Sequence, residues 1–247
     1  MNKKQLYLKL FVLIFFFAIS KSIQSQNLKL SSPNKLIEIK IQTLSQLKFQ
    51  VSLKNNVIIE NVDIGIEMSD GRSIGPKSKV RNVKRETVNQ IVRIPIPNKD
   101  RKIETTYNQI TISLTSNFDV IFRAYNDGVA YRIYDKRDKP KNVIYEKMTL
   151  NFPNDSSTYF PWEESMYSHN ERLYNHIKIS KLNDADFCSL PVLIETEKGK
   201  IVFTESSLHN YPGMFLEKKQ NSNLISKFPN YVLKAVPAGS YNTENGE

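Results

Sequence analysis

The sequence predicts an all-β protein built as an antiparallel sandwich, and three observations support this prediction. Short segments in which apolar and polar residues alternate recur along the chain, and they are rich in Ile, Val, Tyr and Phe. Turn-forming runs separate them, such as NDG at 126–128 and EKGK at 197–200. No stretch after the first 25 residues keeps a 3.6-residue apolar period over three helical turns. Many short strands with nearly no helix are typical of a sandwich.

The expected strands follow one another along the whole chain. In the first half they cover residues 36–42, 47–53, 57–68, 90–96, 109–114, 119–125 and 129–134. In the second half they cover residues 143–152, 175–182, 189–206, 213–218 and 231–236, with a hairpin turn at 197–200. The polar and charged stretch 95–109 lies between two strands and is predicted to be the most flexible connection.

Residues 1–25 have the layout of a secretory signal peptide. Three lysines form a basic start, an unbroken apolar run covers residues 10–19, and small or polar residues follow. A bilayer span needs about 20 apolar residues, so this run is too short, although an uncleaved anchor is the alternative. No cysteine lies at the cleavage region, which argues against lipoprotein anchoring. We expect cleavage between Ser25 and Gln26, export to the periplasm or medium, and no membrane contact of the mature form.

The charge of the mature chain does not indicate a nucleic-acid partner. The leader holds four lysines and no acidic residue, so its removal lowers the formal charge from +10 to +6. The remaining basic residues are scattered and form no recognisable nucleic-acid motif. Cys188 is the only cysteine, so it makes no internal disulfide, and its apolar neighbours predict a small buried side chain.

The stretch FRAYNDGVAYRI, residues 122–133, predicts a hairpin that carries two arginines among aromatic residues. A two-residue turn at Asp127-Gly128 would place Arg123 opposite Arg132. A three-residue loop with Gly128 in the left-handed conformation would instead put one arginine on each face. Register follows the cleaner core face, which favours the two-residue turn. The core face would then consist of Val120, Phe122, Ala124, Tyr131 and Ile133, and the other face of Arg123, Tyr125, Ala130, Arg132 and Tyr134.

Two opposed arginines need compensation in this arrangement. Like charges directly across a strand pair cost stability, so carboxylates or stacked tyrosines are expected over the pair. The simplest interpretation of these arginines is structural, as bridges between sheets or domains.

The stretch FPWEESMYSHNERLYNH, residues 160–176, gathers chemically useful side chains. Aromatic rings stack on sugars, and carboxylates accept hydrogen bonds or bind hard cations. A zinc site is poorly supported, because no cysteine or third histidine lies close by. By composition alone, a polar loop between strands is the simpler interpretation. The candidate residues here are Trp162, Glu163, Glu164, His169, Glu171 and His176.

A third stretch, FTESSLHNYPGMFL at 203–216, ends one strand and begins the next after a Pro212-Gly213 turn. Glu205 and His209 could form an acid–base pair, but nothing in their spacing requires it. A surface loop is the default interpretation.

Together, the hairpin, YSHNERLY at 167–174 and FTESSLHNYPGMFL resemble, in order and spacing, the N-terminal domain of glycoside hydrolase family 97. The opening LKLSSPNKLIEIKI resembles the first strands of that family, so the resemblance covers about residues 28–236. The family combines an N-terminal β-super-sandwich of the galactose-mutarotase type, a (β/α)8 catalytic barrel and a small C-terminal β domain. Its members are calcium-dependent, exo-acting α-glycosidases, including α-glucosidases and α-galactosidases, mostly from the periplasm of Bacteroidetes.

The resemblance assigns residues 26–247 to the N-terminal sandwich, expected to be truncated near its last strand. The catalytic carboxylates would lie on a barrel beginning after residue 247, so no catalytic residue is expected among Glu163, Glu164, Glu171 and Glu205. The resemblance places one calcium ligand at Glu171, effective only when a barrel is supplied in the same or a neighbouring chain. The implied substrate is an α-linked oligosaccharide, although no substrate-binding residue is assigned.

Three functions therefore remain open at this point. The chain could be the N-terminal part of such a glycosidase, inactive alone. It could be a free-standing carbohydrate-binding sandwich, or a structural β protein of the cell envelope.

Overall fold

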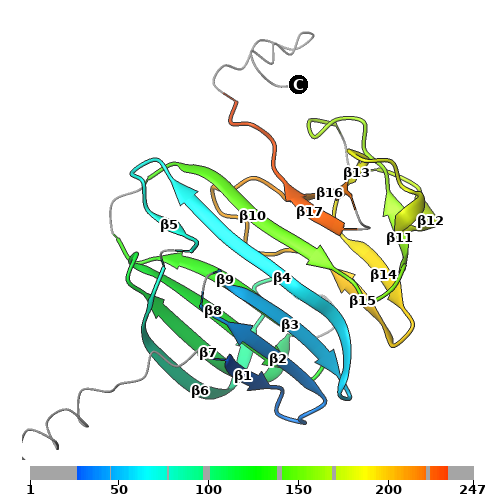
Figure 1. Ribbon diagram of the computed structural model, residues 1–247. Helices are drawn as coiled ribbons and strands as arrows, with labels where there is room; N and C mark the ends of the chain where they lie inside the picture. Colours follow the sequence, from blue (N-terminus) through cyan, green and yellow to red (C-terminus); the bar gives the residue numbers. More distant parts are fainter. Residues whose placement is uncertain are drawn as a thin grey trace, which may run out of the picture.

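Antiparallel strands make up nearly all of the regular structure. The computed structural model describes residues 27–44, 46–76, 78–96, 101–137, 141–168, 171–220 and 223–232, and within these ranges the strands form three sheets (Figure 1). A single three-residue 3₁₀ turn at Ile179–Lys181 is the only helical element in this part of the chain. Residues 1–26, which include the expected leader and its cleavage site, and residues 233–247 lie outside the described residues. None of the described segments forms a helix long and apolar enough for a bilayer span.

The largest sheet, here called sheet A, has nine strands. Its order is β1 (Asn27–Ser31), β2 (Ile37–Gln42), β3 (Lys48–Leu53), β4 (Asn56–Met68), β10 (Val143–Asn151), β17 (Asn223–Lys227), β16 (Phe215–Lys219) and β13 (Phe187–Cys188), with β5 (Ser73–Ile74) paired to β4. Sheet B consists of β6 (Val80–Arg93), β7 (Lys102–Leu114), β8 (Phe118–Tyr125) and β9 (Val129–Asp135). Sheet C consists of β12 (Tyr174–Lys178), β11 (Ser157–Pro161), β14 (Val192–Thr196) and β15 (Gly199–Phe203).

Alternation along the strands builds the core between these sheets. In β8 every second residue is buried, and Phe122 contacts Phe49 of β3 with ring centroids 5.3 Å apart. Sheet B therefore packs on the half of sheet A that contains β1–β4 (Figure 1). Phe160 of β11 belongs to the same apolar cluster as Leu216 of β16, so sheet C packs on the other half of sheet A. The all-β sandwich expected from the sequence is confirmed.

The β8–β9 hairpin confirms the predicted faces and corrects the predicted register. Arg123 pairs with Ala130, and the Tyr125 N–H donates to the Gly128 carbonyl at 2.8 Å. The turn residues are thus Asn126-Asp127, and the two arginines are not opposite each other. The pairing is displaced by two residues, and an even displacement leaves every side chain on its face. The predicted Arg123–Arg132 pair is wrong, and the alternative loop with a left-handed Gly128 is not found either.

For one of the two arginines, Arg123, the expected compensation by a stacked tyrosine is found. Its guanidinium carbon lies 4.6 Å from the centre of the Tyr107 ring, and its Nε donates to Gln109 at 2.7 Å. Both partners are on β7, in the same sheet, so this arginine joins neighbouring strands rather than bridging sheets or domains.

Two other expectations about strand boundaries are also wrong. The stretch predicted to be flexible, 95–109, includes Lys102–Gln109 of β7, which pairs with β6 along its whole length. Strand β6 begins at Val80, far before the predicted 90–96, because its polar first half is held by this ladder. Of the strand predicted at 231–236, Tyr231 and Val232 lie outside any strand, and the other residues lie outside the described residues. Among the described strands, β17 at Asn223–Lys227 comes last, and it was not predicted. The predicted turn at 197–200 is confirmed, with Thr196 opposite Gly199.

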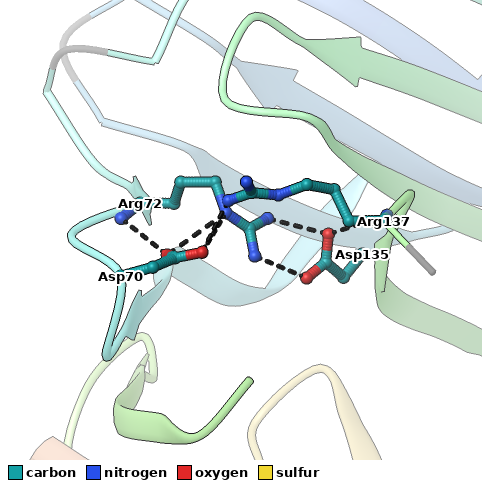
Figure 2. A network of polar contacts seen from close by, with 4 residues as sticks. All are labelled: Asp70, Arg72, Asp135 and Arg137. Atoms are coloured by element: carbon teal, nitrogen blue, oxygen red, sulfur yellow. Dashed lines mark hydrogen bonds and ion pairs between the residues drawn. The ribbon is translucent and has the colours of Figure 1, made fainter. Parts of the chain in front are cut away.

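An alternating network of four charges fastens the end of sheet B to sheet A (Figure 2). Arg72, before β5, donates two parallel hydrogen bonds of 2.7 Å to Asp135 at the end of β9. Its Nε also contacts Asp70, which accepts a further bond from Arg137. The Arg72 guanidinium holds the pKa of the Asp135 carboxyl below its ordinary range.

We predict that Arg72→Gln lowers the melting temperature by a few degrees at pH 7. Gln cannot replace the paired, charged hydrogen bonds to Asp135. Because the pKa of Asp135 is lowered in the folded state, its contribution is present above the ordinary Asp pKa and lost as the pH falls through the lowered value. The difference between wild type and Arg72→Gln should therefore shrink below about pH 4 in thermal melts. A difference that stays constant from pH 7 to pH 3 would contradict this account.

Candidate functional site

The loop between β11 and β12 is organised around one buried carboxylate. The Glu163 side chain has no solvent exposure, and its Oε2 accepts from Arg172 Nε at 2.9 Å and from Ser168 Oγ at 3.2 Å. Arg172 also donates to Ser168 Oγ at 3.0 Å, which closes a triangle across the loop. The Glu163 N–H donates to the Phe187 carbonyl, so the triangle is fixed to sheet A. Glu163 was a candidate ligand by sequence, whereas in the structure it holds the loop in place.

Glu171 directly precedes the anchored Arg172 and is exposed. Leu173, which follows, is 88% exposed. On the other side of the loop, Tyr167 Oη donates to the Asn230 carbonyl at 3.2 Å. This bond ties the loop to the segment that follows β17, so the last described residues run beside the loop that carries Glu171.

One exposed carboxylate fits a single position in a calcium site and no more. Calcium takes six to eight oxygen ligands, whereas the described residues contain no group of three or more His, Cys, Asp or Glu side chains placed to hold a metal. Glu164 is exposed on the same loop, and Glu163 is occupied by Arg172. Glu171 by itself would therefore supply only one of the ligands that such a site needs.

Among the described residues, the histidines do not form a metal site. His169 lies outside the described residues. The His176 ring stacks on Tyr159 with centroids 4.5 Å apart, and its Nε2 lies 2.8 Å from Glu195 Oε2. Lys200 also contacts Glu195, and this ammonium lowers the pKa of the Glu195 carboxyl. These groups lie on the outer face of sheet C as a cross-strand cluster.

Glu205 and His209 do not form the acid–base pair considered from the sequence. Glu205 Oε1 accepts from the Met214 N–H at 2.8 Å and closes the loop that follows β15. The His209 N–H donates to Ser207, and no contact joins its ring to Glu205 within the described residues. The default interpretation as a surface loop is correct.

This second loop nevertheless contributes to a cluster of carboxyl and phenol groups that was not predicted from the sequence. Tyr211 Oη donates to Glu146 of β10, and burial raises the pKa of Glu146. Burial, and then the charge of Glu146, raises the pKa of Glu205. Tyr131 of β9 faces both carboxylates, and burial raises the pKa of its phenol. No sequence spacing links these residues, because they come from three separate elements.

Glu146→Gln is expected to raise the melting temperature by a few degrees at pH 7 and to change it little at pH 4.5. A carboxyl whose pKa is raised by folding stabilises the protein below its unfolded pKa of 4.5, and this is lost as the pH rises through the folded value. Gln keeps an acceptor for Tyr211 without the charge. The measurement is a series of thermal melts from pH 4.5 to 8, with Glu164→Gln as the exposed control. A variant less stable than wild type at pH 7 would refute this explanation.

Comparisons with known proteins agree with one another. The model of the family described as glycosyl-hydrolase 97 N-terminal matches residues 30–237. A retaining α-galactosidase from Bacteroides thetaiotaomicron is 27% identical over 245 residues, which cover 95% of this chain and 37% of that enzyme.

Two solved structures share the fold. A glycoside hydrolase family 97 enzyme from Pseudoalteromonas sp. strain K8, in complex with panose, has a TM-score of 0.72 at 18% identity, over 82% of this chain and 32% of that one. A β-arabinopyranosidase has a TM-score of 0.70 at 17% identity, over 81% and 35%. The chain thus spans about a third of the length of the proteins it resembles.

Proposed function

Because the chain belongs to the glycosyl-hydrolase 97 N-terminal family, we propose that it is the N-terminal domain of an exo-acting α-glycoside hydrolase, of the α-glucosidase or α-galactosidase type. In this proposal residues 26–247 form the sandwich, and residues 1–25 direct export to the periplasm or medium. The substrate is an α-linked oligosaccharide, bound and cleaved on a (β/α)8 barrel in the same or a neighbouring chain. The sandwich supports the barrel and gives Glu171 to its calcium site.

The observation that carries this role is the position of Glu171 on an anchored loop. The Glu163–Ser168–Arg172 triangle fixes Arg172, the residue next to Glu171, so the backbone beside the exposed carboxylate is held in place. A ligand fixed in this way loses little conformational entropy when the metal binds.

The surroundings of Glu171 suit contact with another domain. Leu173 is 88% exposed, and Tyr231, in the segment tied to the same loop by Tyr167, is 87% exposed. Exposed apolar side chains on the two segments joined by the Tyr167–Asn230 bond are candidates for contact with another domain.

A chimera tests the calcium role. This chain would replace the matched 245-residue part of the retaining α-galactosidase from Bacteroides thetaiotaomicron. We expect calcium-dependent hydrolysis, with calcium affinity weakened at least tenfold in Glu171→Gln and unchanged in Glu164→Gln, measured by calorimetry. Equal affinities in the two variants would remove Glu171 from the proposal.

The chain alone should hydrolyse neither p-nitrophenyl α-glucoside nor α-galactoside, and it should not bind calcium tightly. Glycoside hydrolysis requires two carboxyl groups about 5–9.5 Å apart across the scissile bond, one with a raised pKa. The carboxyl groups with raised pKa in this chain, Glu146 and Glu205, are held by Tyr211 and by the Met214 N–H. Turnover that is lost in a single Glu→Gln variant would show that the sandwich is itself an enzyme.

A carbohydrate-binding sandwich is the second candidate, and the outer face of sheet C favours it. Tyr159 and His176 stack there, and the exposed Tyr174 is held across β11 by a 3.0 Å bond from its hydroxyl to the Pro191 carbonyl. Aromatic rings beside the polar Glu195 and Lys200 suit sugar recognition. Retardation on an α-glucan gel that is lost in Tyr174→Ala, but kept in Tyr134→Ala on sheet B, would support this function.

A further inference from the structure

The outer face of sheet A contains a hollow that the proposed function does not use. A cavity of about 260 Å³ opens over β1, β2 and β3 and is bounded on one side by Asn61 of β4. At this point Phe49 pairs with Val62 and Val51 with Ile59, so two residues of β4 lie opposite the single Gln50. This is a β-bulge, and it interrupts an otherwise regular sheet.

The bulge is held in an uncommon backbone conformation. Asn61 has a φ of 44°, in the left-handed region that non-glycine residues seldom adopt. Its carbonyl accepts a 2.9 Å bond from Asn151 of β10, which fixes the bulge from the other side. Bulges and strained residues are common where a sheet forms a binding site.

The polar lining of the cavity is open to a ligand. Four amide side chains line it, and none of them has a side-chain hydrogen bond to another described residue. Each amide offers two donors and one acceptor, which is the pattern that hydroxyl groups of a sugar can use. The four are Asn27, Gln42, Gln50 and Asn61.

Three lysines complete the polar lining, and no carboxylate lines the cavity. Lys29 and Lys40 lie 3.8 and 3.9 Å from a shared neighbour, Glu38, so each is only loosely compensated. Lys48 is paired more closely, at 3.1 Å from Asp63. The register places Lys29 directly opposite Lys40, so two ammonium groups meet at one rim. An oxyanion at this rim would relieve the repulsion between them.

We propose that this cavity binds one sugar unit that carries an oxyanion, such as a uronate or a sugar phosphate. The hydroxyl groups would meet the four amides and the oxyanion would meet Lys29 and Lys40. The volume lies just below the range of about 300–1,000 Å³ that is typical of sites for larger small molecules, which suits a single sugar unit. The site involves neither Glu171 nor its loop, so it stands apart from the proposed calcium role.

The test is a titration of the ¹⁵N-labelled chain, followed by amide chemical shifts. The probes are glucuronate, glucose 6-phosphate, glucose and inorganic phosphate. We expect saturable shifts on β1–β3 with both acidic sugars, and binding at least fivefold weaker for glucose and for inorganic phosphate. Lys40→Gln should weaken the acidic sugars about three- to fivefold. Lys84→Gln, which changes an exposed lysine on sheet B, should leave them unchanged.

Several results would overturn the proposal. Absence of shifts at these strands with both acidic sugars would exclude the site. Glucose binding as tightly as glucuronate would show that the lysines do not select an anion. Inorganic phosphate binding as tightly as glucose 6-phosphate would show a plain anion surface, and an equal loss in Lys40→Gln and Lys84→Gln would show non-specific charge.

Discussion

Replacement of Phe122 by alanine is expected to lower the free energy of unfolding by about 3–5 kcal/mol, one of the two largest single-residue effects in this protein. Phe122 is 1% exposed and lies between sheets B and A. Its ring meets Phe49 edge-on at 5.3 Å and also contacts Tyr131. Alanine would remove these contacts and leave a cavity at the junction of two rigid sheets, which close only partly around it.

Urea unfolding of wild type and variant measures this loss. Phe122→Leu keeps most of the volume and should cost less, so it remains measurable if the alanine variant does not fold. Tyr134→Ala is the control, because Tyr134 points away from the core on the next strand and is 54% exposed. Its change should stay within about 0.5 kcal/mol. If Phe122→Ala cost no more than Tyr134→Ala, the assignment of the core face would be wrong.

Arg172→Met is expected to destabilise the protein by about 3–5 kcal/mol, because it leaves the fully buried Glu163 carboxylate without its cation. The other oxygen of this group, Oε1, already has no hydrogen-bond partner among the described residues. Ser168 alone would then have to compensate the charge. The loss should extend to the direction of Glu171, since Arg172 holds the end of its loop.

A double variant separates the charge from the packing. Glu163→Leu combined with Arg172→Met removes both charges, and it should recover most of the stability lost in the single arginine variant. Arg132→Met is the matched control, because Arg132 is exposed and its side chain makes no hydrogen bond or ion pair with another described residue. Thermal melts should show a decrease of about 10 °C for Arg172→Met and nearly none for Arg132→Met. Equal decreases in these two would contradict a buried anchor.

The β8–β9 hairpin shows which structural features the local sequence pattern can predict. Alternation assigned Phe122 and Tyr131 to the core face and Arg123 to the other, and the structure agrees. Alternation has a period of two, so it cannot distinguish registers that differ by two residues. The turn settled on Asn126-Asp127 instead of Asp127-Gly128. In this register Asn126 also reaches beyond the hairpin, since its side chain accepts from the Asn34 N–H at 2.9 Å.

Long ladders explain the missed strand boundaries. Residues such as Lys84, Glu86 and Glu104 have no strong strand preference, yet they lie in the ladder that joins Val80–Arg93 of β6 to β7. Backbone hydrogen bonds to a neighbouring strand hold these residues in the extended conformation, which their side chains do not favour by themselves. A partner strand that is remote or unrecognised gives no signal within a short window of sequence.

The sequence by itself determined the all-β class, the faces of the hairpin and the family, because these depend on alternation, turn residues and motif order along the chain. The tertiary structure alone decided which carboxylate is buried. The sequence alone does not distinguish Glu163, Glu164 and Glu171. In the structure the Glu163 side chain is enclosed with Arg172, whereas Glu164 and Glu171 face solvent. The pairing of Glu146 with Tyr211, 65 residues away, also could not be predicted from the sequence. Burial and charge compensation depend on contacts between distant segments, and those contacts exist only once the sheets have packed.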